Sequence, residues 1–139
     1  METKKAIYWT RLGVILAFLS LISIVLIFEY SKMNGWTNVF TMIELALLIL
    51  LVISFYLSFI KTGLWKFTHK PIKKLDEREI ALISKSLRYG YAIFSVAVLC
   101  LLLFLALSST TVSIVMATSL ILFAHLIPAS IISWTEKRF

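Results

Sequence analysis

Four apolar stretches, each long enough to cross a lipid bilayer, constrain the fold of this chain more than any other feature. They cover residues 12–28, 39–60, 87–107 and 112–134, and apart from Glu44 and Arg88 they contain no acidic residue, lysine or arginine. A bilayer core about 30 Å thick takes roughly 20 helical residues to cross, and lipid offers no partner to unpaired backbone N–H and C=O groups. We therefore predict an all-α integral membrane protein with four transmembrane helices.

The composition agrees with this prediction. The 139 residues are 60% hydrophobic and have a mean hydropathy of +0.96, whereas ordinary globular domains are about 45–50% apolar. Short connections join the first pair of stretches and the second pair, and this predicts two antiparallel hairpins. We expect one four-helix transmembrane domain over residues 1–139, with residues 61–86 as its long loop.

The basic residues predict the orientation of the chain. Of the 14 Lys and Arg residues, all except Lys32 lie before the first stretch, in the long loop or its junction with the third stretch, or after the fourth stretch. Lys and Arg are retained in cytoplasmic loops. We predict that both termini and the loop face the cytoplasm in a cell inner membrane. The net charge of +7 then reflects topology, and we expect no nucleic-acid partner.

The first half of the long loop mixes cations with large apolar side chains. Its sequence is KTGLWKFTHKPIKK, in which Lys66, Lys70, Lys73 and Lys74 are the candidate contacts. Such a segment suits a surface of anionic lipid headgroups, at about 1 kcal/mol per nearby cation, or a protein partner. The alternative is a loop that is basic only because it is cytoplasmic.

The second half of the loop contains a helix start. Asp76 is a good N-cap, Glu79 stands three residues later as in a capping box, and Glu77 adds negative charge to the first turn. Arg78 lies between the two glutamates, so capping accounts for the acids better than a metal site does. We predict that the third helix begins in the cytoplasm near Asp76 and continues to about Leu107.

This helix start resembles a known signature. Leu75-Asp76-Glu77-Arg78-Glu79 and the residues after it are similar to the D-E-R-x signature that opens the third helix of small prokaryotic four-span membrane proteins grouped as domains of unknown function. The resemblance covers about thirty residues and the layout of two hairpins. It implies the architecture and a prokaryotic inner membrane, and it supplies no chemistry.

Glu44 is the candidate for ion or proton coupling. It lies about six residues inside the second stretch, where an acid costs up to about 2.5–3.5 kcal/mol on insertion scales. One hypothesis is a coupling carboxylate. The other is a carboxyl group that reaches the outer headgroups or binds a neighbouring helix. Ser54 and Ser58 share its helix face, and Gly13, Ala17 and Ser20 form a small-residue stripe on the first stretch.

His125 and Pro128 are the remaining candidates inside the membrane. Pro128 has no N–H and leaves the Ala124 carbonyl free beside the imidazole, which favours a kinked, hydrated spot. Ligation of haem or a metal is the alternative, but the other histidine, His69, falls in the loop. We therefore predict no metal site and no cofactor.

No catalytic fingerprint is present, and Cys100 is the single cysteine, which excludes an internal disulfide relay. We expect a non-catalytic accessory or regulatory protein that acts through its basic loop, with a protein partner, lipid or a second copy as partner. The alternative is a small homo-oligomeric transporter or channel with Glu44 as the coupling carboxylate.

Overall fold

The computed structural model describes the backbone of residues 2–136 and the side chains of residues 5–136, and every regular element in that part of the chain is helical. The long helices are α1 (Glu2–Asn34), α2 (Asn38–Phe55), α4 (Glu77–Leu107) and α5 (Ile114–Thr135). Within the described residues four helices, with α2 extended to Ile60, are long and apolar enough to cross a membrane. This confirms the predicted all-α class and the four helices of membrane-spanning length.

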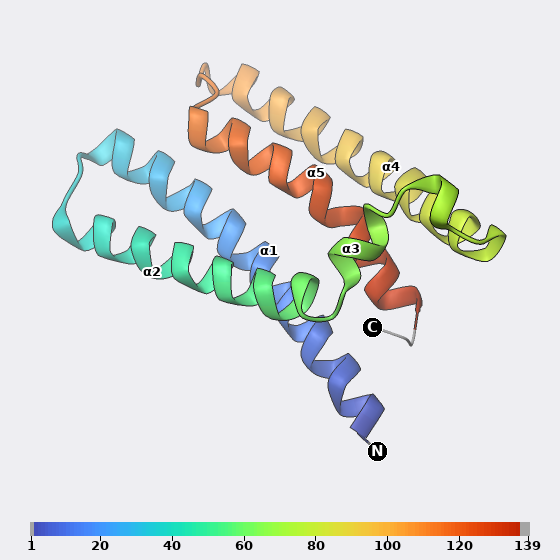
Figure 1. Cartoon of the computed structure of the whole chain (residues 1–139). Helices are drawn as coiled ribbons and strands as arrows, with labels where there is room; N and C mark the ends of the chain where they lie inside the picture. Colours follow the sequence, from blue (N-terminus) through green and yellow to red (C-terminus); the bar gives the residue numbers. More distant parts are fainter. Residues whose placement is uncertain (1, 137–139) are drawn as a thin grey trace.

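Three short elements connect the second and third long helices. They are the π-helical turn η1 (Tyr56–Ile60), the helix α3 (Leu64–Thr68) and the 3-10 turn η2 (Ile72–Lys74). Gly63 precedes α3 with φ = +77°, a left-handed conformation that glycine adopts without steric cost. The backbone therefore reverses here, and α3 returns toward the long helices (Figure 1).

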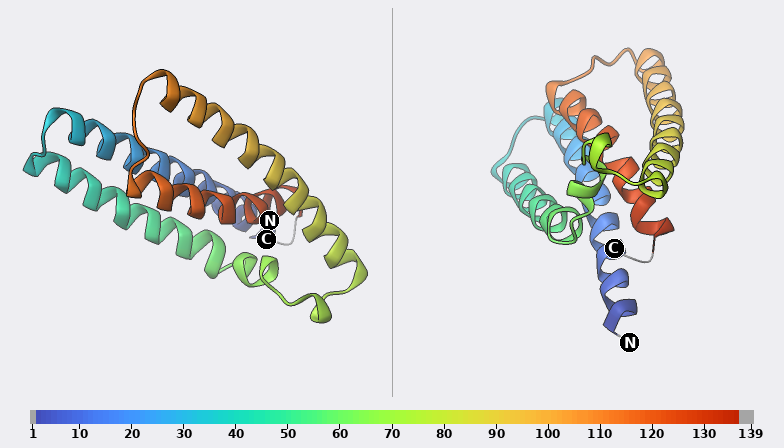
Figure 2. Two further views of the ribbon diagram at one scale, coloured as in Figure 1. Left: turned by 90° about the horizontal axis from the view of Figure 1, so that it is seen from above. Right: turned by 45° about the vertical axis from the view of Figure 1, so that its right-hand side comes forward.

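The long helices are arranged in the spatial order α2, α1, α5, α4. Helix α1 packs against both α2 and α5, and α4 packs against α5, so α2 and α4 form the two edges (Figure 2). The connections at residues 35–37 and 108–113 lie at one end of the molecule. The start of α1, the end of α5 and the α3–η2 segment lie at the other end (Figure 1).

Small side chains allow α1 and α2 to approach closely. Ala17 and Ser20 are 0% and 1% exposed, and Ser54 and Ser58 are also buried. This confirms that the small stripe of α1 and the serine face of α2 pack inside the protein. Ser20 and Ser54 each donate to the carbonyl one turn back at 2.7 Å, so their hydroxyls need no partner on another helix, whereas the buried Ser58 hydroxyl has no hydrogen-bond partner.

The start of α4 agrees with the sequence prediction. The Asp76 side chain accepts a hydrogen bond of 2.6 Å from the Glu79 N–H, and the Asp76 N–H in turn donates to the Glu79 carboxylate. These reciprocal bonds form a capping box. The helix then continues without a break to Leu107.

The loop residues between η1 and α4 differ from the expected surface segment. Leu64 and Phe67 are 0% and 6% exposed, and both belong to the core cluster that also contains Leu51 and Leu126. Their apolar side chains gain more by packing between η1 and α5 than by facing headgroups. The segment that the sequence placed on the lipid surface is therefore anchored in the protein.

Candidate functional site

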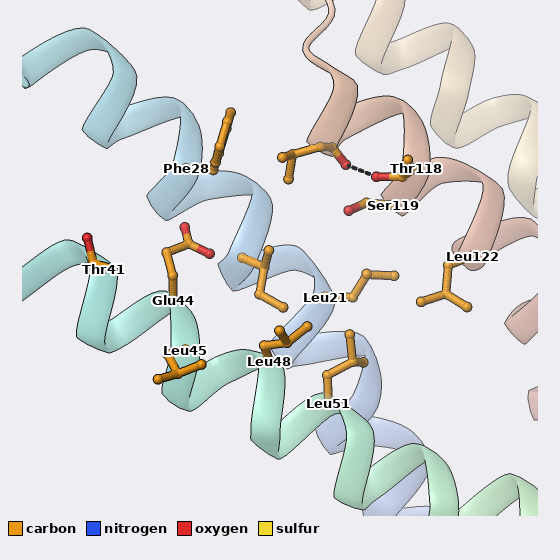
Figure 3. Close-up of a pocket in the computed structure, with 12 residues that line it drawn as sticks. Leu21, Phe28, Thr41, Glu44, Leu45, Leu48, Leu51, Thr118, Ser119 and Leu122 are labelled. Atoms are coloured by element: carbon orange, nitrogen blue, oxygen red, sulfur yellow. Dashed lines mark hydrogen bonds between the residues drawn. The ribbon is translucent and has the colours of Figure 1, made fainter. Parts of the chain in front are cut away.

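A groove of about 510 Å³ runs between α2 and α5 with α1 as its floor (Figure 3). Its α1 residues are Leu21, Ile24 and Phe28; α2 supplies Thr41, Glu44, Leu45, Leu48 and Leu51; α5 supplies Val115, Thr118, Ser119 and Leu122. The groove exists because α2 and α5 both pack on α1 and leave space between them. Glu44 is the only charged residue in this lining.

Glu44 points into the groove rather than toward a partner (Figure 3). Its residue is half-buried, and its Oε1 atom is buried with no hydrogen-bond partner. Thr118 lies across the groove, but its hydroxyl donates to the Ile114 and Val115 carbonyls at 2.9 and 3.0 Å. The interhelical hydrogen bond considered from the sequence is therefore not made, and the Oε1 atom remains available to a bound group.

Apolar side chains close the groove toward the α3 end. Leu51 and Leu122 line its last part, and beyond them α3 fills the space against η1 and α5. Leu64 and Phe67 supply this closure from α3. Ser54, on the Glu44 face of α2, donates to the Leu50 carbonyl at 2.7 Å. Ser54 therefore offers no free hydroxyl for a path from Glu44 toward α3, whereas the hydroxyl of Ser58, the next serine on this face, is buried without a hydrogen-bond partner.

The basic residues of the loop divide into two groups. Lys66, Lys73 and Lys74 are exposed, as their predicted contact role requires. Lys70 instead donates a 2.7 Å hydrogen bond to Glu79 Oε2, because α3 and the first turn of α4 lie close together. This ion pair removes Lys70 from the group of freely available cations.

The ion pair also affects Glu79, which lies in the first turn of α4, outside the predicted span 87–107. The hydrogen bond from Lys70 holds the pKa of the Glu79 carboxyl below its usual range, and the Asp76 N–H acts in the same direction. Arg78, two residues after Asp76, reaches Glu136 with 3.5 Å between Nη2 and Oε2. The helix-start signature thus joins the loop, α4 and the end of α5.

Arg11 makes a contact between α1 and the end of α5 that the sequence did not reveal. Its Nε and Nη2 atoms donate to the Ser133 and Trp134 carbonyls at 3.3 and 3.2 Å, and its guanidinium lies 4.9 Å from the Trp134 ring centroid. The last carbonyls of a helix lack intrahelical donors, and a cation is favourable there. Arg11 was assigned only to topology, because nothing in the sequence brings it next to residues 133 and 134.

His125 and Pro128 have separate environments. The His125 Nδ1 atom lies 2.9 Å from the Ile121 carbonyl oxygen, so the imidazole uses the carbonyl one turn before it. Pro128 packs against Gly90 of α4, where an added Cβ would come within 3.0 Å of the Pro128 Cγ atom. The proline therefore marks a close contact between α4 and α5. Unexpectedly, the His69 ring lies near His125, with centroids 6.3 Å apart.

Two features of the sequence analysis fall partly outside the described residues. Lys137 and Arg138, which contributed to the orientation, lie beyond residue 136, and the side chain of Lys4 is likewise not described. Among the described residues, no group of three or more His, Cys, Asp or Glu side chains has the arrangement of a metal site.

No protein-family model matches the chain, and no curated protein or solved structure matches it either.

Proposed function

We propose that the chain spans a prokaryotic inner membrane four times, as two antiparallel hairpins with the termini and residues 61–86 in the cytoplasm. The four long apolar helices support this proposal. So does the position of the α3–η2 segment, which carries most of the loop cations, at the same end as the start of α1 and the end of α5. Membrane insertion in this orientation would leave Lys32 as the outer cation.

We propose further that the protein is a non-catalytic accessory or regulatory membrane protein that acts through its cytoplasmic end. The observation that carries this proposal is an anchored basic surface, which we define as Lys66, Lys73 and Lys74. All three side chains are exposed, on a segment whose neighbours Leu64 and Phe67 are buried. A surface held in this way loses less conformational entropy on binding than a free loop does.

Anionic lipid headgroups are the partner that this surface favours. Three exposed cations near the predicted inner interface attract anionic lipid at about 1 kcal/mol each, whereas Lys70 is already paired with Glu79. The interaction is electrostatic and should weaken as salt shortens the Debye length from about 10 Å at 0.1 M toward 3 Å at 1 M. An acidic protein partner would use the same cations.

The test is the lipid composition around the intact protein. We would reconstitute it in bilayers of phosphatidylcholine with a minor share of labelled phosphatidylserine and measure energy transfer from protein tryptophan to the labelled lipid. Replacing Lys66, Lys73 and Lys74 together by Gln should abolish the enrichment of phosphatidylserine at low salt. The matched variant with Arg at all three positions should retain it. Equal enrichment in the Gln and Arg variants would contradict the proposal.

A second function, a small homo-oligomeric transporter or channel, is favoured by one observation. The Glu44 Oε1 atom is buried without a hydrogen-bond partner in the groove between α2 and α5, and such groups in membranes mark ion or proton sites. Because Leu64 and Phe67 are buried in the core cluster that includes the groove residue Leu51, we propose that transport would use a path between copies. Proton and cation flux in proteoliposomes tests this alternative directly.

A further inference from the structure

The groove between α2 and α5 has a charged end and an apolar end. Figure 3 shows Phe28 of α1 and Glu44 of α2 at the end nearer the connection between these helices, and Leu51 and Leu122 at the other end. The groove volume of about 510 Å³ lies within the roughly 300–1,000 Å³ of sites for drug-sized organic molecules. The groove is therefore large enough for a small organic ligand.

The polar groups of the groove leave one acceptor without a donor. The Glu44 Oε1 atom is buried and has no hydrogen-bond partner among the described residues. The Thr41 and Thr118 hydroxyls donate to carbonyls one turn back, at 3.3 and 2.9 Å. A carboxylate accepts hydrogen bonds and cannot donate them, and burying its charge unpaired is costly. A ligand that supplies a positive charge would therefore complement Glu44.

An organic cation fits this lining better than a metal ion does. Ca²⁺ takes about six to eight oxygen ligands, whereas residues 5–136 contain no group of three or more His, Cys, Asp or Glu side chains arranged for a metal. An organic cation can place its charge beside the carboxylate and its apolar body along Leu45, Leu48 and Leu122. Phe28 adds an aromatic ring at the charged end, and such rings attract cations.

We propose that this groove binds an amphipathic organic cation, such as a lipophilic amine or a quaternary ammonium compound. Its charged head lies between Glu44 and Phe28, and its apolar body lies along the leucines of α2 and α5. The proposal rests on the site of the transporter alternative and names the substrate class of that function. Binding does not require transport, however, and the two can be measured separately.

The test uses the full chain in a neutral detergent. Tetraphenylphosphonium, a cation with four apolar rings, is titrated into the protein by calorimetry, with the same titration into detergent alone as the blank. Two further probes are titrated in separate samples. Tetraphenylborate has the same shape with the opposite charge, and tetramethylammonium has the charge without the rings. We expect saturable binding of one tetraphenylphosphonium, and binding of each other probe that is at least about 10-fold weaker.

Two variants of the groove are compared with two matched controls. Glu44→Gln removes the charge and should weaken binding of tetraphenylphosphonium by at least about 10-fold, since loss of one partner of a close charge pair is costly. Leu48→Trp fills the groove and should block binding with the carboxylate intact. The control Glu29→Gln removes an acid whose Oε1 atom is also buried without a partner but which does not line the groove. The control Leu103→Trp adds the same ring on an exposed face of α4.

Both controls should bind tetraphenylphosphonium as the wild type does, and circular dichroism establishes that each variant is folded. Absence of saturable binding to the wild type, or unchanged binding in Glu44→Gln, would overturn the proposal. So would binding of tetraphenylborate that Leu48→Trp blocks, because the groove would then accept apolar molecules such as lipid chains whatever their charge. Flux in proteoliposomes is measured in parallel. Binding without flux would support this proposal and reject the transporter alternative, and proton flux without binding would do the reverse.

Discussion

Gly13 of α1 lies directly against Ser58 of η1, so that a Cβ atom on the glycine would overlap the serine hydroxyl and come within 3.3 Å of the serine Cβ. Ser58 is 1% exposed, and its hydroxyl has no hydrogen-bond partner. The two residues are thus tightly packed, and the Ser58 hydroxyl makes no hydrogen bond. It lies where the α-helical hydrogen bonds of α2 give way to the π-helical turn, and such turns are frequent at sites under functional constraint.

Gly13→Ala should therefore destabilise the protein. Overpacking of a well-packed contact costs about 1–3 kcal/mol, and we expect a loss of this size in the free energy of unfolding measured in mixed detergent micelles. Ser58→Ala removes the overlapping hydroxyl, so the double variant should recover most of the loss. Wild-type stability of Gly13→Ala would contradict the close contact between α1 and η1.

The ion pair of Lys70 with Glu79 predicts a pH-dependent stability. The folded-state pKa of Glu79 is lowered, chiefly by the hydrogen bond from Lys70, relative to an unfolded glutamate at about 4.3. Its contribution is therefore present above the unfolded pKa and is lost as the pH falls through the folded pKa. Glu79→Gln should melt at a lower temperature than the wild type near neutral pH, and the difference should vanish in acid. The control Glu77→Gln, in the same turn, removes a charge near the helix start but no ion pair among the described residues, so its loss near neutral pH should be smaller than that of Glu79→Gln.

Arg11 should stabilise the end of α5. A cation at a helix C-terminus contributes about 0.3–1 kcal/mol, and an exposed cation–π contact adds about 0.5–1 kcal/mol. We expect Arg11→Gln to cost about 1 kcal/mol and to accelerate hydrogen exchange of the amides in residues 132–136. Arg11→Lys keeps the charge but loses the planar fork that reaches two carbonyls, so its effect should be smaller. Unchanged exchange in Arg11→Gln would contradict the capping role.

Labelling of single cysteines should establish the orientation. In a Cys100→Ala background, Asn34→Cys should react with an impermeant maleimide in intact cells, because residue 34 ends α1 at the predicted outer side. Lys73→Cys is exposed in η2 and should react only after permeabilisation. Labelling of position 73 in intact cells would reverse the proposed topology and place the basic surface outside.

Local rules predicted the helices because lipid-length apolar runs and caps act within a few residues. The run through residues 87–107 and the cap at Asp76 thus define α4 closely. The position of α3 could not be predicted in the same way. Helix α3 returns toward α5 because the backbone reverses at Gly63 and because Leu64 and Phe67 are buried. This burial depends on contacts with residues far away in the sequence, so local rules do not predict it.

The candidate site shows the same division. Helical spacing predicted that the face with Ser54 and Ser58 is buried, and both serines are buried. The spacing could not show that the Glu44 Oε1 atom on this face has no hydrogen-bond partner. The proximity of His69 to His125 was not predicted from the sequence, because one residue lies in a loop and the other in a span. Reasoning by depth fails here, since α3 carries its C-cap residue back to the surface of α5.

Glu44 provides the prediction that separates the two proposed functions. A buried polar atom without a partner costs about 1–3 kcal/mol, so a residue retained only for structure should be replaceable at no loss. Because the Glu44 Oε1 atom has no hydrogen-bond partner and the neighbouring groove residues on α2 are Leu45 and Leu48, Glu44→Leu should raise the free energy of unfolding by about 1 kcal/mol. Glu44→Gln keeps the size and polarity, so its stability should be close to that of the wild type.

If Glu44 couples ions, both variants should abolish proton or cation flux in proteoliposomes, because neither can ionise. If the protein is an accessory protein, the wild type should show no flux above that of protein-free liposomes, and both variants should retain the phosphatidylserine enrichment. Destabilisation by Glu44→Leu would mean that the carboxyl group makes a stabilising contact that this structure does not contain.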